Sequence, residues 1–343
     1  MSRRRLLAIG VAVLAAAGVG IAAAARHEGG FAVTRLVTDA RDAKLVNAWG
    51  LASSPTGPWW VASEARNAST LYAGNGRKQT LTVSVQGGPT GIAYYGGRGF
   101  VVHGGGASAP ARFLYACEDG TIRAWSPTVP HIWSAEAVVA VDLGAKGAVL
   151  RGLALAGNRL YVTDFHNGRV LVFDDRWRRI VRRGAFVDPA VPAWYAPFGI
   201  AVLHGRVFVS FASPAPVNGN DAPTGGYVDE FDLSGRLVAR VAQMGALNEP
   251  WGIALAPDGR LLVANFGSGR INAYSRHGHG WSFAGQLRGR DGRPIAISGL
   301  WGIAFGNGGL AGSKDTLFFA AGPHRWRGAS ESDVHGLLGT IAS

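Results

Sequence analysis

Cysteine is almost absent from this chain, since Cys117 is the only one among 343 residues. No intrachain disulfide can form, so the fold depends on its own core. Cys117 ends the apolar run that begins at Phe113, which indicates a buried thiol. Charged residues make up only 16% of the chain and hydrophobic residues 48%, which excludes a disordered protein. So few charges also argue against coiled coils and long surface helices.

Glycine is abundant by contrast, with 51 residues, about twice the ordinary usage. The glycines follow no G-X-Y period, which excludes collagen. Together with 11 Trp they favour short strands joined by tight turns. The net charge of +12 allows two interpretations. One is a solvated basic surface, and the other is contact with an anionic polymer or a membrane surface.

Residues 1–25 predict an export signal. Three arginines, Arg3 to Arg5, precede an uncharged run from Leu6 to Ala25 that ends in small residues suited to a signal peptidase. The order Ser-Arg-Arg-x-Leu-Leu resembles a twin-arginine export signal. The run is also long enough for an uncleaved anchor. We therefore expect an exported protein (periplasmic, cell-envelope or extracellular), either cleaved or retained by its N-terminus, with residues 31–343 forming one domain.

A six-residue pattern with a glycine at its third position recurs six times. Its copies are Ala48–Ser53, Pro89–Tyr94, Leu150–Leu155, Pro197–Val202, Pro250–Leu255 and Leu300–Phe305. The shared glycines are 41 to 61 residues apart. A period of roughly 40–50 residues built from short strands is the signature of a β-propeller.

Further strands follow each copy. After the third copy, Arg159–Asp164 and Arg169–Phe173 flank an Asn-Gly turn, and Arg260–Asn265 with Arg270–Tyr274 is its near copy. Fourth strands are expected at Leu81–Val85, Val138–Leu143, Arg179–Val187, Arg236–Gln243 and Phe283–Gly289. Each repeat thus supplies four strands, which make one blade.

The sixth repeat contains only three strands, the last two at Asp315–Ala321 and Gly336–Ala342. Its fourth strand can come from residues 31–37, which would remove the free edge between the first and last blades. The sequence therefore predicts an all-β, six-bladed β-propeller with four-stranded blades, the last one closed by the N-terminal strand.

The repeat P-x-G-[IL]-A-[VL], followed by a strand that ends near Asp or Asn, resembles the NHL-type propeller repeat. Over roughly residues 31–343 the chain also resembles an uncharacterised family of exported bacterial β-propellers. The matching stretches are Asn47–Leu51, Cys117–Ile122, Thr163–Val170, Tyr195–Phe198, Pro250–Ala254, Asn265–Ile271 and Gly299–Gly302. The resemblance implies no activity. Some members carry a PEP-type C-terminal sorting signal, but no such tail is expected here.

The residues just before the shared glycines should meet around the central channel. They are Trp49, Thr90, Arg151, Phe198, Trp251 and Trp301, with Asn47 nearby. One interpretation is packing between blades. The other is an aromatic face for a sugar or planar ligand, on which Arg151 holds an anionic group. This ring contains no Asp, Glu or Asn, which disfavours the metal site of gluconolactonase-like propellers, and we expect no metal or other cofactor.

A second ring is expected at the ends of the second strands. Its members are Ser63, Cys117, Asp164, Phe211, Asn265 and Gly322, with Glu64, Glu118 and Asp119 adjacent. Asp164 and His166 could form a general acid–base pair, although an Asp that braces its own turn is commoner. The catalytic candidates are thus Asp164, His166, Glu118 and Asn265.

Other features carry weaker signals. His277 with His279 is weak evidence for a metal site. His324 and His335 flank a polar loop, 325–333, for which cover over one channel mouth and a simple mobile loop are both open interpretations. The sequence has no P-loop and no G-x-S-x-G elbow. The densest basic patch is expected at a blade's outer rim, where it would protect an edge or bind an anionic polymer. It consists of Arg176, Arg178, Arg179, Arg182 and Arg183.

Together these patterns favour a non-catalytic module that binds a small molecule, a glycan or a protein through the channel mouth and the loops around it. The enzymatic alternative is a hydrolase or lyase of propeller type, either lactonase-like or streptogramin-lyase-like. Nucleic acid is not an expected partner, because no recognition motif is present.

Overall fold

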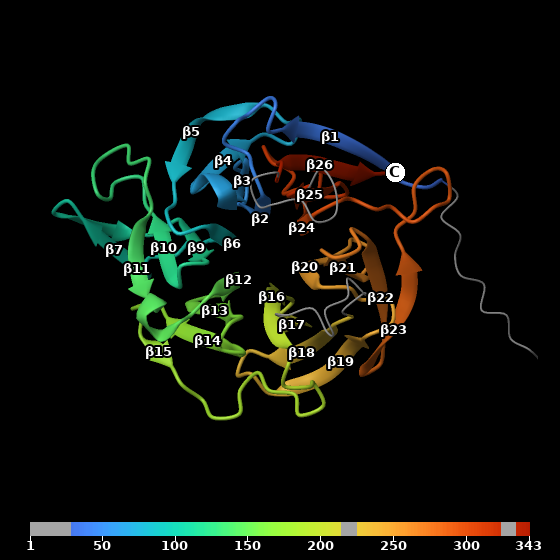
Figure 1. Cartoon of the computed structure of the whole chain (residues 1–343). Coiled ribbons are helices and arrows are strands. Elements are labelled where there is room, and N and C mark those ends of the chain that lie inside the picture. The colour runs from blue at the N-terminus through green and yellow to red at the C-terminus, as the bar shows by residue number, and fades with distance from the viewer. Residues whose placement is uncertain (1–28, 214–224, 324–333) are drawn as a thin grey trace, which may run out of the picture.

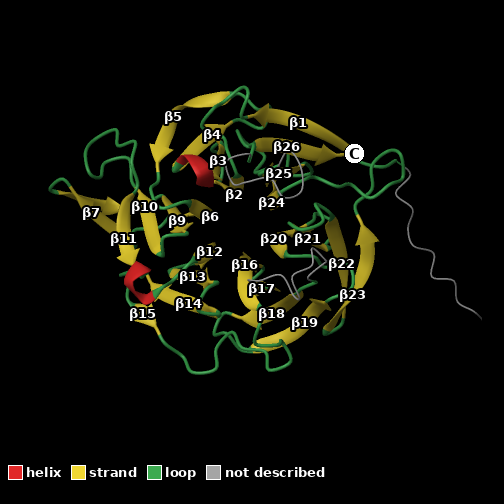
Figure 2. Ribbon diagram, in the orientation of Figure 1, coloured by secondary structure: helices red, strands yellow, loops and turns green. Residues whose placement is uncertain are grey.

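The computed structural model describes residues 29–213, 225–323 and 334–343, in which six four-stranded sheets surround one central axis (Figure 1). Each sheet is one blade, numbered here from 1 to 6 in chain order. The predicted six-bladed propeller is therefore confirmed. Two short 3-10 helices, η1 (Glu64–Arg66) and η2 (Gly144–Lys146), accompany the strands (Figure 2). The predicted export signal and the loop 325–333 with His324 lie outside the described residues.

The blades share one order of strands from the axis outward. The innermost strands are β2 (Ala48–Ser53), β6 (Pro89–Tyr94), β12 (Leu150–Ala156), β16 (Ala196–Leu203), β20 (Pro250–Leu255) and β24 (Leu300–Phe305). The second strands are β3 (Trp59–Ser63), β9 (Phe113–Cys117), β13 (Arg159–Asp164), β17 (Arg206–Ala212), β21 (Leu261–Asn265) and β25 (Leu317–Ala321). The third strands are β4 (Ala68–Tyr72), β10 (Thr121–Trp125), β14 (Arg169–Asp174), β18 (Tyr227–Asp232), β22 (Ile271–His277) and β26 (Leu337–Ala342).

The outermost strands differ most from blade to blade. They are β5 (Lys78–Ser84), β11 (Val138–Asp142), β15 (Arg179–Ile180), β19 (Leu237–Gln243), β23 (Gly280–Gln286) and β1 (Ala32–Thr38). Blade 2 also carries an inserted hairpin of β7 (Val101–Gly104) and β8 (Ala107–Pro110). This insertion accounts for the longest step between shared glycines.

The ring is closed by the two ends of the propeller domain. Strand β1 pairs with β26 in antiparallel register, from Ala32 opposite Ala342 to Thr38 opposite Leu337, as the sequence predicted. Just beyond this ladder, Nδ1 of His335 lies 2.7 Å from Oδ2 of Asp39. Burial raises the pKa of Asp39, but hydrogen bonds from His335 and the backbone of Gly336 outweigh it and bring that pKa below its ordinary value.

The shared glycines allow the inner strands of neighbouring blades to approach closely. A Cβ on Gly152 would lie 3.0 Å from the carbonyl oxygen of Phe198 in the next blade. A Cβ on Gly50 would lie 2.6 Å from the carbonyl oxygen of Thr90. A Cβ on Gly302 would lie 2.6 Å from that of Trp49, across the closure of the ring. A larger side chain would push the blades apart, so the repeated glycine follows from the ring geometry.

The predicted fourth strand at Arg179–Val187 is wrong in length, because β15 ends after two residues. Beyond it the chain turns through Gly184 and Phe186, which both have positive φ. Phe186 then packs between Tyr161 (5.7 Å between ring centroids) and Phe231 (5.4 Å), where it is buried. Burying this ring between blades 3 and 4 evidently outweighs a longer ladder.

Candidate functional site

The aromatic residues that precede the shared glycines do meet in the channel. Trp49 and Trp301 stack with their ring centroids 3.6 Å apart. Trp251 packs edge-on against both, at 5.7 Å and 5.9 Å, and Phe198 does so at 6.5 Å and 5.9 Å. All four rings are buried, so they plug the channel as one aromatic core. Thr90 instead donates its hydroxyl to the backbone oxygens of Ala116 and Leu150.

A second layer lies above this aromatic core, and the sequence prediction named its glutamates, Glu64 and Glu118, but not its phenylalanines. It consists of Glu64, Glu118, Phe165, Phe266 and Gly322, which follow the second strands, and of Ala212, which ends β17. The backbone N–H groups of five of these residues bond to carbonyls of the loop that leads into the same blade, at Asn47, Gly88, Val149, Glu249 and Gly299. This repeated bond holds the layer over the channel, at the end we call the mouth.

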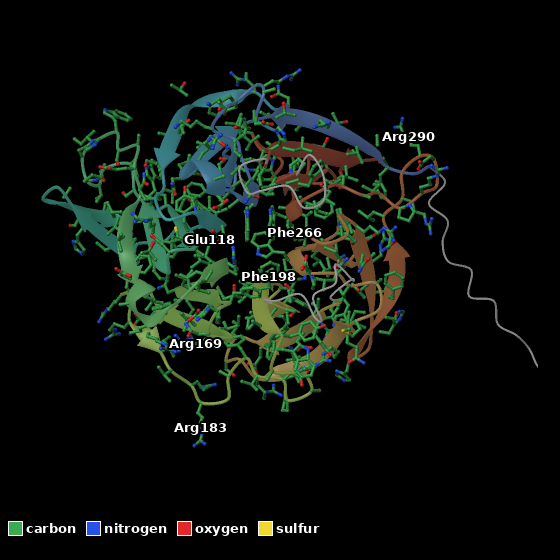
Figure 3. All side chains as sticks on the ribbon, viewed as in Figure 1. Glu118, Arg169, Arg183, Phe198, Phe266 and Arg290 are labelled. Atoms are coloured by element: carbon green, nitrogen blue, oxygen red, sulfur yellow. The ribbon has the colours of Figure 1, made fainter. Side chains whose placement is uncertain are left out.

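Two phenylalanines of the second layer extend the aromatic core. Phe266 stacks on Trp301 with centroids 3.9 Å apart, and Phe165 packs on Phe198 at 4.8 Å. Both are only half-buried. Their shared place in two near-identical repeats, after Asp164 and after Asn265, was the signal that could have revealed them. Figure 3 shows Phe266, Phe198 and Glu118 grouped around the axis.

The second layer also corrects the predicted ring of strand ends. The register pairs Leu300 with Ala321, as it pairs Leu150 with Asp164. Ala321 therefore occupies the position that was assigned to Gly322, and Gly322 belongs to the next layer. A Cβ on Gly322 would clash with Asn47.

Charged groups line one side of the mouth. Arg151 forms an ion pair with Glu118 and lies over the ring of Trp49, 5.1 Å from its centroid. Asn47 donates to Oε2 of Glu64 at 2.7 Å and accepts from the indole of Trp301 at 3.1 Å. Arg151 and Asn47, both predicted, are thus part of the site, and each is tied to a glutamate.

The two carboxylates of Glu64 and Glu118 are neighbours across Gly88. A Cβ on Gly88 would lie 3.4 Å from an oxygen of each glutamate. Gly88 has a positive φ of 70°, so a glycine both fits the backbone and leaves room between the carboxylates. The mouth therefore has an acidic wall of Glu64 and Glu118, and Arg151 contacts both Glu118 and the ring of Phe165.

Two buried donors in the aromatic core lack protein partners. Among the described residues, neither the indole nitrogen of Trp49 nor that of Trp251 has a hydrogen-bond acceptor. Their residues are 3% and 8% exposed. An unsatisfied buried donor costs about 1–3 kcal/mol. A small polar molecule in the channel would relieve that cost.

Asp164, His166 and Asn265 are placed as parts of turns. Asp164 is fully buried and accepts from Asn167 (2.9 Å) and from Nε of Arg169 (3.0 Å). His166 is exposed, and among the contacts of the described residues it shares no hydrogen bond with Asp164. Asn265 accepts from the backbone of Asn248 and donates to the carbonyl of Arg270. These bonds favour a structural role for Asp164 and Asn265, and they leave no acid–base pair between Asp164 and His166 among the described contacts.

Cys117 is buried at the end of β9, and burial raises the pKa of its thiol to about 12. The thiol is therefore protonated and sheltered at neutral pH. Within the described ranges, no three His, Cys, Asp or Glu side chains gather as a metal site. The helices in these ranges are too short and polar to cross a bilayer.

A pocket of about 400 Å³ opens beside the mouth on blade 5. It is lined by Asn248, Ser268, Arg270, Phe283 and Gln286, among others. Its lining residue Asn248 accepts a hydrogen bond from the backbone N–H of Gly267, the residue after Phe266. This volume is within the ordinary range of small-molecule sites.

The basic patch lies at the outer rim of blade 3, where the sequence placed it. Arg176 and Arg178 sit in the turn between β14 and β15, Arg179 opens β15, and Arg182 and Arg183 follow that strand. Their distance from the mouth along the blade makes them a separate surface. Figure 3 shows Arg183 pointing away from the molecule.

Comparison with known proteins agrees with the repeat pattern. A family model described as NHL repeat matches residues 150–173 and 247–274, in blades 3 and 5. The uncharacterized protein R648 of Acanthamoeba polyphaga mimivirus is 33% identical over 282 residues, which cover 77% of this chain and 69% of that protein. Its uncharacterized protein L690 is 31% identical over 282 residues, covering 77% and 74%. These relatives are viral, so the resemblance to exported bacterial proteins remains a prediction.

Solved structures show the same fold at low identity. The virginiamycin B lyase of Staphylococcus aureus aligns with a TM-score of 0.52 and 15% identity, covering 90% of this chain and 99% of that one. The soluble aldose sugar dehydrogenase of Escherichia coli aligns with a TM-score of 0.54 and 12% identity, covering 90% and 99%. Such identities establish a shared architecture and no shared chemistry.

Proposed function

Since this chain belongs to one family of NHL-repeat β-propellers with the mimivirus proteins R648 and L690, we propose its function from its own site: it binds a neutral sugar at the channel mouth. The observation that carries the proposal is the stack of Phe266 on Trp301 on Trp49, which reaches from the buried core to the half-exposed mouth. The flat apolar face of a sugar ring packs well on such an aromatic surface.

The polar groups at the mouth suit sugar hydroxyls. Glu64 and Glu118 offer acceptor oxygens on the acidic wall of the mouth, and hydroxyl groups can donate to them. The indole N–H groups of Trp49 and Trp251 could donate to a hydroxyl or to an ordered water. Because Arg151 is already engaged by Glu118, we take the ligand to be neutral rather than anionic. The pocket on blade 5 gives room for further sugar units.

Calorimetric titration of the purified protein with a panel of neutral oligosaccharides tests this proposal. We expect at least one sugar to bind, and Phe266→Ala to weaken it by about tenfold because a stacking surface is lost. Trp133→Ala is the matched control, since Trp133 is an exposed aromatic residue (87%) in a blade 2 loop. Equal affinity in Phe266→Ala and wild type, or no heat with any sugar, would contradict the proposal.

The enzymatic alternative has less support. A lyase or hydrolase that uses Asp164 and His166 needs the two side chains to act together, but Asp164 is committed to Asn167 and Arg169. Asn265 is likewise committed to backbone groups. We therefore propose binding without turnover. Hydrolysis of lactones or cleavage of a streptogramin by the purified protein would overturn this part of the proposal.

We also propose that the protein is exported, as residues 1–25 predict. Sequencing the N-terminus of the protein from its native cells tests this. A mature chain that begins near residue 26 in an extracytoplasmic fraction would support cleavage, and an intact N-terminus in membranes would support an anchor. An intact chain in the cytosol would contradict export.

A further inference from the structure

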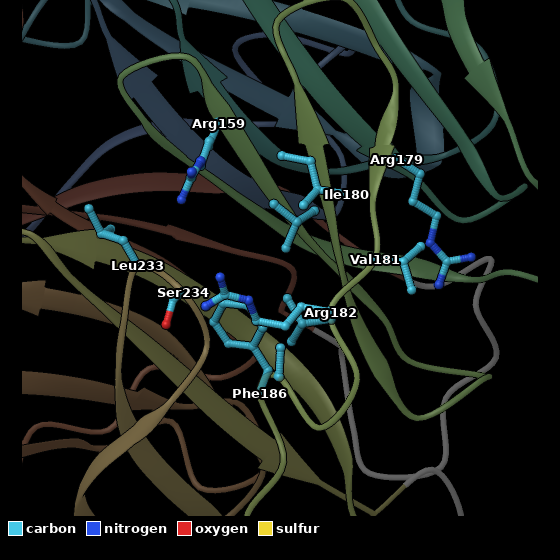
Figure 4. A pocket seen from close by; sticks show the side chains of 11 residues that line it. Arg159, Arg179, Ile180, Val181, Arg182, Phe186, Leu233 and Ser234 are labelled. Atoms are coloured by element: carbon cyan, nitrogen blue, oxygen red, sulfur yellow. The ribbon is translucent and has the colours of Figure 1, made fainter.

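A second cavity, of about 110 Å³, lies at the rim between blades 3 and 4, far from the mouth along both blades (Figure 4). It exists because β15 has only two residues, so the outer part of β14 has no full-length neighbour. Its floor is apolar and includes Val170, Val172 and Phe186. Its volume is several times that of one water molecule, about 30 Å³.

Three arginines line this cavity: Arg159 from β13, Arg179 from β15 and Arg182 just beyond it. In Figure 4 the guanidinium group of Arg182 lies beside Phe186 and that of Arg159 lies toward Leu233, whereas that of Arg179 points away from both. Arg159 and Arg182 therefore border the same small apolar floor. All three arginine residues are exposed, so an anion can reach their guanidinium groups from solvent, and its charge would offset the repulsion between them.

The acidic residues of the adjoining turns are already paired elsewhere. Asp174 binds Arg178 at 2.7 Å, and Asp232 binds Arg236 at 3.1 Å and Ser234 through its hydroxyl. The hydroxyl of Ser234, and then Arg236, lower the pKa of Asp232 to about 2 despite partial burial. Among the described residues, no carboxylate lies within ion-pair distance of Arg159, Arg179 or Arg182. The cavity thus has positive charge that the rest of the protein does not neutralise.

We propose that this rim cavity binds a phosphate or sulfate group. Guanidinium groups present paired N–H donors that match the oxygens of such groups, and the apolar floor strengthens these charge-assisted bonds. Arg176 and Arg183 extend the positive charge along the rim, so the group can be a free ion or one unit of a polyanionic chain. This site is independent of the sugar site at the mouth, and neither requires the other.

Binding to the purified full-length protein is measured by calorimetry with inorganic phosphate, sodium sulfate, dextran sulfate and neutral dextran. We expect dextran sulfate or the free ions to bind, and neutral dextran not to bind. Binding of the free ions identifies a small-ion site, and binding of dextran sulfate alone identifies a polymer site. Both results support the oxyanion chemistry, whereas binding of neither the ions nor the sulfated polymer overturns it.

Paired variants separate this cavity from general attraction to a basic protein. Arg159→Gln/Arg182→Gln removes the two guanidinium groups that border the apolar floor and should weaken binding about tenfold or more. Arg290→Gln/Arg293→Gln removes the same net charge from exposed positions across the ring from the rim cavity, where Figure 3 labels Arg290, and should change affinity by less than about threefold. Thermal melts establish that both variants are folded. Equal weakening in the two variants would mean nonspecific attraction and would overturn the proposal.

Discussion

Blades 3 and 5 are near copies in sequence, and the structure separates what they share from what they do not. Their three inner strands have the same order and similar lengths, and Asp164 and Asn265 end the second strand of each. Their outer strands differ, with two residues in β15 and seven in β23. The repeat therefore governs the blade near the axis and leaves the rim free to vary.

The physical reason lies in the neighbours of each strand. An inner strand touches the next blade closely enough that its glycine has no room for a side chain, as Gly252 does beside Trp301. An outer strand has solvent on one side, so shortening it costs only part of a ladder. Blade 3 uses that freedom to bury Phe186 and to form the arginine cavity, while blade 5 has a complete ladder and a pocket next to the mouth.

The largest expected effect comes from adding a methyl group at the shared glycine of each blade. A Cβ on Gly252 would overlap the carbonyl oxygen of Trp301, whereas a Cβ on Gly152 would lie 3.0 Å from that of Phe198. We expect Gly252→Ala to lower the free energy of unfolding by about 3 kcal/mol and Gly152→Ala by about 1 kcal/mol. Urea denaturation measures both. Equal losses would contradict this ranking, because they would show that the Gly252–Trp301 contact accommodates a methyl group as easily as the Gly152–Phe198 contact does.

The next prediction asks whether blade 5 can form an ion pair like that of Asp164 with Arg169 in blade 3. Arg270 stands five residues after Asn265, as Arg169 stands after Asp164. Asn265→Asp places an oxygen where an amide donates to the carbonyls of Val263 and Arg270, and should cost about 2 kcal/mol of unfolding free energy. A new pair with Arg270 would offset part of that cost.

A double-mutant cycle measures this compensation. Arg270→Gln alone should change stability by less than about 0.5 kcal/mol, because Arg270 is exposed. Arg270→Gln added to Asn265→Asp should cost about 1 kcal/mol more than the two separate losses predict. Strict additivity would mean that blade 5 cannot form the pair, and that the turn chemistry of the two blades is fixed by more than these two residues.

The sequence predicted the inner strands and most of the outer ones, including the closure by β1, and it was wrong on the length of β15. Six copies of one glycine pattern were enough to count the blades, and ring symmetry then brought Trp49, Phe198, Trp251 and Trp301 together. The length of β15 could not be read from residues 179–187, since it depends on Phe186 finding a place between Tyr161 and Phe231 of two blades.

The candidate site was predicted in part for a similar reason. The residue before each glycine was tested as a ring, but the residue after each second strand was not, so Phe165 and Phe266 were missed. The ion pair of Arg151 with Glu118 joins blades 3 and 2. Such a contact depends on how two sheets dock, which no single repeat encodes.

The smallest expected effect concerns the rim itself. The chain after β15 has no ladder partner, so in brief tryptic digestion of the folded protein we expect cleavage after Arg182 or Arg183 well before cleavage after Arg276, in the β22–β23 hairpin. Both blades expose arginine, and mass spectrometry of the first fragments reports each site in one experiment. Because Arg276 pairs with Trp281 in the β22–β23 ladder, its site opens only when that end of the hairpin frays. First cleavage at Arg276 would show that the short outer strand holds blade 3 as firmly as the long one holds blade 5.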